Sequence, residues 1–328
     1  MRRLLPIAAC LLCLGTGASD AAQREVLGKH ARIEAIPVAL DPGDPAHVRL
    51  GALTYLGGVR LRSPDSAFGS FSAMQVIGDH FLLVSDAGNV VRFRMDARFR
   101  LSDASFGDVT LGPGTGQRKQ ERDVESLAYD PATGRIWLGF ERENAIWRYD
   151  ASLARTARYA HPPAMRDWSS NGGAESMVRL HDGRFIVISE SSRPKNALAK
   201  TGRVALMFAG DPTEKPDQGF TFTYLPPAGF DPSDMTQLPD GRLLVLNRRF
   251  AVPALFTATL TLIDPRTIRP GAAVQGREIA RFAAPVLHDN FEALAVTREG
   301  QDTILWIASD DNQQIWEQSL LLKFRLDL

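Results

Sequence analysis

Acidic residues recur in this chain at intervals of fifty to sixty residues, each within a similar phrase. Small and apolar residues follow the acid, and then come a polar turn and an aliphatic run. The aligned acids are Glu125, Glu175, Asp234 and Glu292, and a weaker first copy has Ser72 in this place. Carboxylates that converge repel each other unless they are protonated or bridged by a cation, and Ca²⁺ takes about six to eight oxygen ligands. The spacing therefore predicts an acidic site for Ca²⁺ wherever the fold brings the repeats together.

A second set of acids follows the aliphatic runs. Asp86 and Asp310 stand at the ends of the first and last runs, and Glu141 and Glu190 follow two of the runs between them. Antiparallel pairing within each repeat would return these acids to the face where the first set lies. The metal ligands that we predict are thus the four aligned acids together with Asp86 and Asp310. The alternative is that the repeated acids only accept hydrogen bonds from backbone N–H groups of the neighbouring repeat, because both causes produce acidic clusters.

Basic residues near these acids would complete a site for an anionic substrate. Arg142 and Arg248 follow aliphatic runs, and Arg193 and Lys195 lie in a polar segment. An arginine fork binds phosphate in a bidentate way, so these four side chains are the predicted substrate-binding residues. Salt bridges between Arg142 or Arg248 and the acids are the alternative, since both kinds of charge fall near one face.

No familiar catalytic motif accompanies these charges. The chain has neither a G-x-S-x-G elbow nor an H-E-x-x-H helix, and its six histidines are scattered. The glycine-rich stretch 112–119 lacks the spacing of a phosphate-binding loop, so we predict a flexible connector there. The sequence therefore identifies no catalytic residue.

The period itself predicts the architecture. Repeats of this length that contain several short strands are typical of propeller blades. Within each repeat we expect a hairpin at a turn such as Asp182-Gly183, followed by two outer strands. Five repeats are counted directly, and six is the alternative count. The last repeat is incomplete, so we predict that N-terminal strands around 33–39 and 49–61 complete it and close the ring. The predicted fold class is all-β, a single propeller of four-stranded blades.

The charge balance restricts the partners. The 38 basic residues equal the 38 acidic ones, so the chain carries no net charge. Net charge therefore offers no attraction to nucleic acid or to an anionic membrane, and any charged site must be local. No segment is apolar over a sufficient length to cross a bilayer. We expect a monomer whose partner is a small anionic molecule or a protein of the cell envelope.

Residues 1–22 have the pattern of an export signal. Arg2 and Arg3 precede an apolar stretch over 4–15, and small residues follow at candidate cleavage sites. This pattern predicts a mature domain over 23–328, in the periplasm or secreted. Cys10 and Cys13 lie inside the signal, so their C-x-x-C spacing is accidental and the mature chain has no disulfide. A lipoprotein anchor at Cys10 is the less favoured alternative, because too short an apolar region precedes it.

Several phrases of the chain together resemble one family. They are D-V-E-S-L-A, G-G-A-E-S-M, P-S-D-M-T-Q-L-P-D-G-R-L-L-V-L-N-R-R-F, D-N-F-E-A-L-A and S-D-D-N. In this order they resemble the phytase-like propeller domain, often labelled esterase-like activity of phytase, from about Leu53 to the C-terminus. The resemblance implies an exported bacterial β-propeller with a basic residue at the position of Arg248, and the family's label suggests the hydrolysis of phosphoesters or esters. The family tends to have Gly after the acid, whereas this chain has Ser126, Ser176 and Ala293.

Two functions are consistent with these residues. The first is an exported hydrolase of phosphoesters or related esters, assisted by Ca²⁺ at an acidic axial site. The second is a non-catalytic propeller that binds a ligand or a protein partner in the cell envelope, since propellers host both roles. The acids with nearby arginines favour the first, and the lack of a recognisable nucleophile favours the second.

Overall fold

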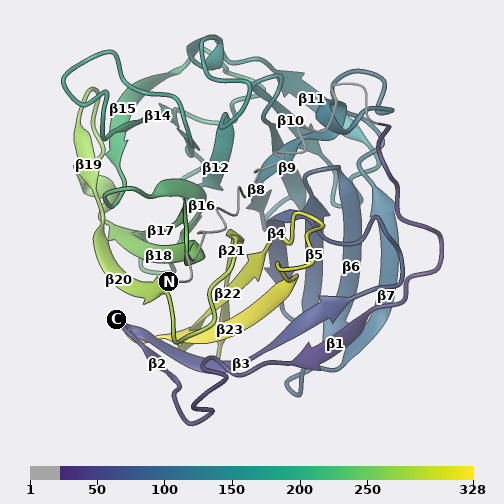
Figure 1. The fold of residues 1–328 in the computed structure, drawn as a ribbon. Coiled ribbons are helices and arrows are strands. Elements are labelled where there is room, and N and C mark those ends of the chain that lie inside the picture. Colours follow the sequence, from purple (N-terminus) through teal and green to yellow (C-terminus); the bar gives the residue numbers. More distant parts are fainter. Residues whose placement is uncertain (1–22) are drawn as a thin grey trace, which may run out of the picture.

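Five sheets stand around one axis (Figure 1). The computed structural model describes residues 23–328, so the predicted export signal lies outside the described residues. Strands form nearly all of the regular structure. The 3₁₀ turns among the described residues are η1 (Lys119–Arg122), η2 (Pro163–Met165) and η3 (Pro265–Thr267). The prediction of an all-β propeller with five blades is confirmed, and the alternative count of six is wrong.

Each blade is a four-stranded antiparallel sheet, given below from the axis outwards. Blade 1 consists of β4 (Phe71–Ile77), β5 (His80–Ser85), β6 (Asn89–Met95) and β7 (Leu101–Asp108). Blade 2 consists of β8 (Val124–Asp130), β9 (Arg135–Phe140), β10 (Ala145–Tyr149) and β11 (Thr156–Ala160). Blade 3 consists of β12 (Ala174–Arg179), β13 (Phe185–Ser189), β14 (Arg203–Phe208) and β15 (Gly219–Leu225). Blade 4 consists of β16 (Asp231–Gln237), β17 (Leu243–Ala251), β18 (Leu255–Ile263) and β20 (Arg277–Phe282).

Blade 5 joins the two ends of the chain. It consists of β21 (Phe291–Glu299), β22 (Asp302–Ser309), β23 (Leu320–Leu326) and β3 (Leu53–Arg62). β23 pairs antiparallel with β3, with Leu321 opposite Val59. The fourth strand of the last blade therefore comes from the N-terminal part of the chain, as the incomplete last repeat predicts. This pairing closes the ring and covers an edge that β23 would otherwise expose.

Three short strands extend the outer edges of the blades. β1 (Glu34–Pro37) and β2 (Arg49–Leu50) both pair with β3. β19 (Ala273–Gln275) pairs in parallel with β15, although the chain reaches it from blade 4. This strand therefore links the rims of blades 3 and 4.

The core is divided into five apolar clusters, and each cluster lies between two neighbouring blades. Between blades 5 and 1, the rings of Trp306 and Phe81 meet edge to face at 4.8 Å. Between blades 2 and 3, Trp137 meets Phe185 in the same manner at 4.9 Å. The second strand of each blade is covered on both faces by such clusters. This explains why the sequence shows continuous aliphatic runs there rather than an alternating pattern.

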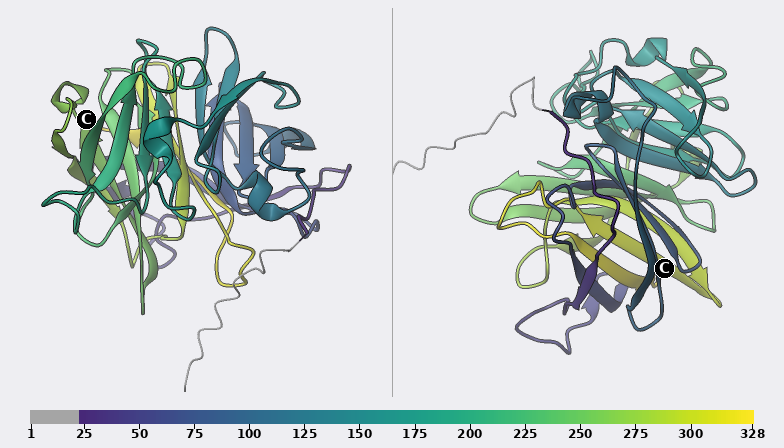
Figure 2. Two further views of the ribbon diagram at one scale, coloured as in Figure 1. Left: turned by 90° about the horizontal axis from the view of Figure 1, so that it is seen from above. Right: turned by 90° about the vertical axis from the view of Figure 1, so that its right-hand side faces the viewer.

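The inner strands β4, β8, β12, β16 and β21 all begin at one end of the ring, which we call the mouth face. Long loops lie on this face, together with the tip of the β17–β18 hairpin (Figure 2). They comprise residues 109–123, 161–173, 190–202, 249–254 and 310–319. Over residues 23–328, no helix combines the length and apolarity needed to cross a membrane.

We expect Phe324→Ala to destabilise the protein by about 3–5 kcal/mol, because it removes a fully buried ring from the closing blade. Phe324 contacts the rings of Tyr55 on β3 and Phe282 on β20, so its loss leaves a cavity where the chain ends meet. Urea unfolding measures the effect. Phe250→Ala is the matched control, since the Phe250 ring is 62% exposed and its removal should change stability by about 0.5 kcal/mol at most. Equal effects of the two substitutions would contradict the proposed closure.

Candidate functional site

Every inner strand carries a β-bulge near its first residue. In each blade the pairing with the second strand skips one residue at the same place. The skipped residues, which we call the bulge ring, are Ser72, Glu125, Glu175, Ser233 and Glu292. A bulged residue leaves the strand ladder, and bulges often redirect a side chain beside a functional site. The fold therefore presents these five positions together at the mouth of the axis.

Asp234 does not belong to the bulge ring, which corrects the sequence alignment by one residue. Asp234 pairs with Leu246, and the skipped position in blade 4 is Ser233. The Asp234 carboxylate accepts hydrogen bonds from the backbone N–H groups of Met235 and of Leu294 in blade 5, both at 2.7 Å. Asp234 thus connects two blades, as the backbone-bonding alternative predicts, and lies apart from the other acids.

A second ring of charges stands where the second strands reach the mouth. Its members, which we call the outer ring, are Asp86, Glu141, Glu190, Arg248 and Asp310. Each of these residues lies opposite the residue two positions before the bulge in its blade. In blade 1, for example, the Asp86 N–H donates a hydrogen bond to the Ser70 carbonyl. Asp310 N–H donates to the Asn290 carbonyl in the same manner. The predicted return of Asp86 and Asp310 to the face of the first set is therefore what the strand pairing produces.

Two members of the bulge ring, the buried Glu175 and the half-buried Glu125, have no direct hydrogen-bond partner among the described residues. Neither the Glu125 nor the Glu175 carboxylate receives a hydrogen bond from residues 23–328, although Glu175 is only 4% exposed. Burial, followed by repulsion from neighbouring carboxylates, holds both pKa values well above the ordinary range. Repulsion by Glu175 contributes to the shift at Glu125. These are acids that a bound cation would stabilise.

Three carboxylates in blade 2 are close enough to share one ion. Oxygens of Asp123, Glu125 and Glu141 lie within 4.8 Å of one another. Glu141 also accepts hydrogen bonds from the N–H groups of Gly172 and Gly173, which orient it from blade 3. Asp123 stands two residues before the bulge, so the i, i+2 spacing of Asp123 and Glu125 was the signal in the sequence that could have identified it.

Arg248 is the central cation of the site. Its guanidinium contacts Glu292 of blade 5 at 2.9 Å and Glu190 of blade 3 at 3.0 Å. It also donates to Oδ1 of Asn290 at 2.8 Å, and the Asn290 amide donates to Glu292. Burial opposes the charge of Arg248, but the surrounding carboxylates outweigh it and raise its pKa. Arg248 of blade 4 therefore links blades 3 and 5. These contacts are the salt bridges predicted from the sequence as the alternative to substrate binding.

The other predicted cations lie in two different places. Arg142 forms a salt bridge of 3.0 Å with Asp123, so it belongs to the acidic mouth. Arg193 and Lys195 line a separate open cavity of about 640 Å³ beside blade 3. Lys195 is 90% exposed there and lies 3.7 Å from Asp167. The structure thus brings Arg142 and Arg248 to the acids, but not Arg193 and Lys195.

Lys119 is a site residue that the sequence did not reveal. Its ammonium contacts Asp86 at 2.5 Å, and its pKa is raised because the attraction of Asp86 outweighs the penalty of burial. The glycine-rich loop that carries Lys119 is organised around the buried Arg122, which donates to the carbonyls of Val109 and Thr110. The predicted flexible connector is therefore an ordered loop that places a cation at the mouth.

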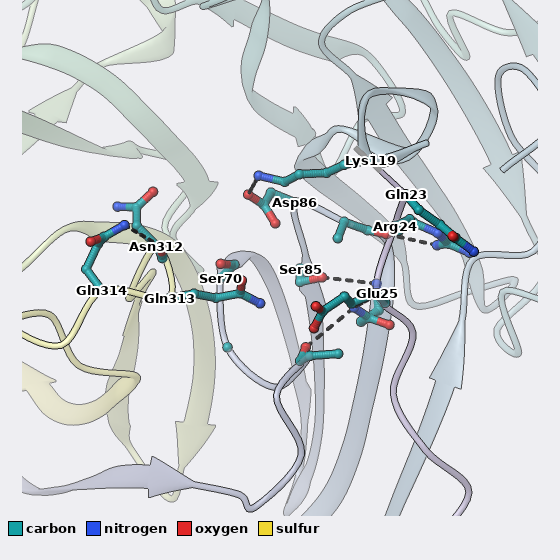
Figure 3. A pocket seen from close by; sticks show the side chains of 14 residues that line it. Gln23, Arg24, Glu25, Ser70, Ser85, Asp86, Lys119, Asn312, Gln313 and Gln314 are labelled. Carbon is teal, nitrogen blue, oxygen red and sulfur yellow. Dashed lines mark hydrogen bonds and ion pairs between the residues drawn. The ribbon is translucent and has the colours of Figure 1, made fainter. Parts of the chain in front are cut away.

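A polar cavity of about 470 Å³ adjoins the mouth at Asp86 and Lys119 (Figure 3). Its lining includes Gln23, Ser70 and Asn312, which come from three separate segments. The Oδ1 atom of Asp86 is buried and has no hydrogen-bond partner within residues 23–328. Burial raises the pKa of Asp86, and Lys119 partly opposes this shift. The cavity gives a small polar molecule access to the edge of the acidic mouth.

The acids and cations of the mouth do not balance. The acids are Asp86, Asp123, Glu125, Glu141, Glu175, Glu190, Glu292 and Asp310, and the cations are Lys119, Arg142 and Arg248. Burial raises the pKa of Asp310, and the nearby Glu292 and Asp86 raise it further. The arrangement can therefore bind an additional cation and, through its own cations, an anionic group.

Comparison with known proteins gives one family and several similar folds. The family model described as "Phytase-like: Esterase-like activity of phytase" matches residues 66–313. No curated protein matches the chain. The Myxococcus xanthus glutaminyl cyclase structure is 10% identical, with 92% of this chain and 97% of that chain covered and a TM-score of 0.43. The Malassezia sympodialis allergen Mala s 1 is 13% identical, with 90% and 96% covered and a TM-score of 0.44.

A third structure with a similar fold is the Kuenenia stuttgartiensis hydrazine synthase. It is 10% identical, with 76% of this chain covered and a TM-score of 0.37. This chain spans only 58% of the length of that chain.

We predict that stability falls as the pH rises from about 4 to about 7, and that Asp289→Asn reduces this slope. Burial raises the pKa of Asp289 from 3.8 to about 7. The folded protein therefore keeps a proton that the unfolded chain releases, so raising the pH favours unfolding. One such group contributes at most about 1.4 kcal/mol per pH unit. Urea unfolding in EDTA at several pH values measures the slope.

Asp96→Asn is the control for this experiment. Hydrogen bonds with the backbone and side chain of Arg100 lower the pKa of Asp96 to about 2, so its titration lies below the tested range. Above about pH 5, where Asp96 is ionised in both the folded and the unfolded protein, the slope should be unchanged in this variant. A full wild-type slope in Asp289→Asn would show that Asp289 is ionised throughout the range.

Proposed function

This chain belongs to the phytase-like family, and from that premise we propose that it hydrolyses phosphoesters or related esters at the acidic mouth, with the assistance of Ca²⁺. The observation that carries the proposal is the excess of carboxylates at the mouth, most of them buried and two of them without hydrogen-bond partners within residues 23–328, beside Lys119 and Arg248. Such an excess is costly unless a cation neutralises it. The substrate class is a small anionic ester.

The donor set fits Ca²⁺. Asp123, Glu125 and Glu141 would hold the ion, and among the charged neighbours of Glu125 it is Glu175 that raises its pKa most. All of these ligands are hard oxygen donors, which Ca²⁺ prefers, and thiolate or imidazole ligands are absent from this set. The bound ion would polarise a phosphoryl or carbonyl oxygen of the substrate.

The protein's own cations would orient the substrate. Lys119 extends from an ordered loop to the border between the mouth and the polar cavity, with its side chain 43% exposed. An ammonium in this place can pair with an anionic oxygen of a molecule in the cavity. Arg248 maintains the positions of Glu190 and Glu292 by contacting both, so its main effect is on the shape of the acidic mouth.

A non-catalytic binding propeller is the second candidate. The observation that favours it is that Lys119, Arg142 and Arg248 are all already paired with carboxylates of the mouth. In this case the mouth would bind an ion and a ligand or envelope protein without chemistry. The export pattern of residues 1–22 supports a location in the periplasm or outside the cell for either function.

We expect Ca²⁺ to raise the midpoint of thermal unfolding of the EDTA-treated protein. A ligand that binds only the folded state stabilises it by mass action, by about 2.7 kcal/mol when its concentration is one hundred times Kd. The double variant Glu125→Gln/Glu175→Gln should lose this response, because it removes two charges that face the ion. Differential scanning calorimetry with and without Ca²⁺ provides the measurement.

Glu143→Gln is the matched control for the calcium experiment. Glu143 is exposed and lies two residues from Glu141, outside the bulge and outer rings. It should keep the full response. The absence of any response in the wild-type protein would refute the calcium site and would leave the acids to the protein's own cations.

We further expect Lys119→Gln to lower kcat/KM for a phosphomonoester by about tenfold or more, since it removes a charge-assisted contact with the anionic substrate. Lys200→Gln is the control, because Lys200 is an exposed residue of another mouth-face loop. Unfolding midpoints of both variants show whether the fold is intact. If the wild-type protein binds Ca²⁺ but hydrolyses neither phosphoesters nor carboxylic esters, the binding propeller is the correct function.

A further inference from the structure

The most exposed large apolar side chains of this protein are concentrated on two projections. Ile315 and Trp316 are 97% and 61% exposed, and they form the apex of the loop between β22 and β23. Phe250 and Val252 are 62% and 80% exposed, and they form the tip of the β17–β18 hairpin. Exposed apolar side chains grouped in this way are characteristic of an interaction site.

Both projections lie on the mouth face. The first follows Asp310 and the second follows Arg248, which are members of the outer ring in neighbouring blades. They extend beyond the sheets on the same side of the disc (Figure 2). Each is a convex apex supported by an ordered base. Asp311 accepts hydrogen bonds from Ser70 N–H and Ser319 Oγ at the base of the first, and the Phe250 and Phe256 rings pack at 5.1 Å in the second.

The exposed charges of the long mouth-face loops are mainly positive. On the mouth-face loops over 109–123, 161–173, 190–202, 249–254 and 310–319, Asp167 is the exposed acid. The exposed cations of the same loops are Arg118, Arg166, Arg193, Lys195, Lys200 and Arg249. Glu25 and Glu143 are further exposed acids of this face, and the acidic mouth opens on it, so the positive excess is confined to the surrounding long loops.

The described chain also begins on this face. Gln23, Arg24 and Glu25 line the cavity beside the acidic mouth.

We propose that the mouth face docks on an anionic lipid surface, with the Ile315–Trp316 apex and the Phe250–Val252 apex inserted at the level of the headgroups. Aromatic and aliphatic side chains next to Lys and Arg are the combination found at membrane interfaces. The apolar side chains contribute burial, and the surrounding cations are attracted to anionic headgroups. Arg193 and Lys195, which lie away from the acidic mouth, would be among the cations that contact the headgroups.

The shape of the mouth face favours a lipid surface over other occupants. Two separate convex tips cannot enclose a small ligand. A planar surface can contact both tips at once and accept each without a complementary shape. Docking does not depend on Ca²⁺ binding or on hydrolysis, so this proposal goes beyond the proposed function and can fail independently of it.

Sedimentation with vesicles tests the proposal. The span 23–328 is used, because it contains the complete closed ring and lacks the apolar stretch over 4–15. In EDTA it should bind vesicles of phosphatidylcholine mixed with an equal part of phosphatidylglycerol, and should bind phosphatidylcholine alone more weakly. Added salt should reduce the difference. Trp316 fluorescence should be quenched by brominated lipid in the same samples.

Paired variants assign the binding to the two apexes. Ile315→Ser/Trp316→Ser and Phe250→Ser/Val252→Ser should each weaken vesicle binding by about tenfold or more, because each removes two inserted apolar side chains. Ile77→Ser is the matched control, since Ile77 is 50% exposed on the opposite face. Arg193→Ser/Lys195→Ser should reduce the preference for the anionic vesicles, whereas Arg98→Ser/Arg100→Ser on the opposite face should not.

Several outcomes would overturn the proposal. Equal binding by the apex variants and the wild-type protein would show that the apexes do not insert. The absence of binding to the anionic vesicles would show that this face does not dock on lipid. Light scattering that shows wild-type self-association, lost in the apex variants while vesicle binding is absent, would identify a second copy of the chain as the occupant instead. Glu125→Gln/Glu175→Gln should bind vesicles normally, which separates docking from the calcium site.

Discussion

The pairing of β23 with β3 is the constraint on which the rest of the structure depends. Propeller blades bury their faces only against one another, as the five inter-blade clusters show, so an open ring would expose two of those faces. Closure also forces the five inner strands to begin around one axis. The charges at their first residues must then share a small volume, whatever their mutual repulsion.

The acidic mouth is the electrostatic consequence of that closure. Glu125, Glu175 and Glu292 lie at equivalent bulges, and each raises the cost of ionising another. Arg248 offsets part of this cost where blades 3, 4 and 5 meet, and Lys119 offsets part of it at Asp86. The protein stays folded despite the rest of this cost, because the free energy gained by burying the apolar clusters is large compared with the penalty of burying one carboxylate. Unbalanced buried charge retained at one mouth is a common property of functional sites.

Blade 4 differs from the other blades because it supplies a cation to the outer ring of the acidic mouth. It places Ser233 in the bulge ring, as blade 1 places Ser72, and Arg248 in the outer ring, where the four other blades carry acids. The Ser233 hydroxyl donates to the carbonyl of Phe291 in blade 5 at 3.0 Å, and Asp234 bonds to the same blade through Leu294. Blade 4 therefore connects its neighbours and neutralises part of their charge, and the proposed calcium ligands lie at blade 2, with Glu175 of blade 3 beside them.

The sequence by itself determined the repeat, the closing of the last blade by N-terminal strands and the places of Glu125, Glu175 and Glu292, whereas the structure decided between five blades and six. These properties depend on spacing along the chain and on continuous apolar runs, which local physics makes visible. Only the tertiary structure decided that Ser233 and not Asp234 stands at the bulge, because side chains alternate along a strand and a shift of one residue turns them to the other side. It also decided which carboxylates Arg248 and Lys119 contact, since these pairs join different blades or a loop and a blade. Spacing within one repeat carries no information about such contacts.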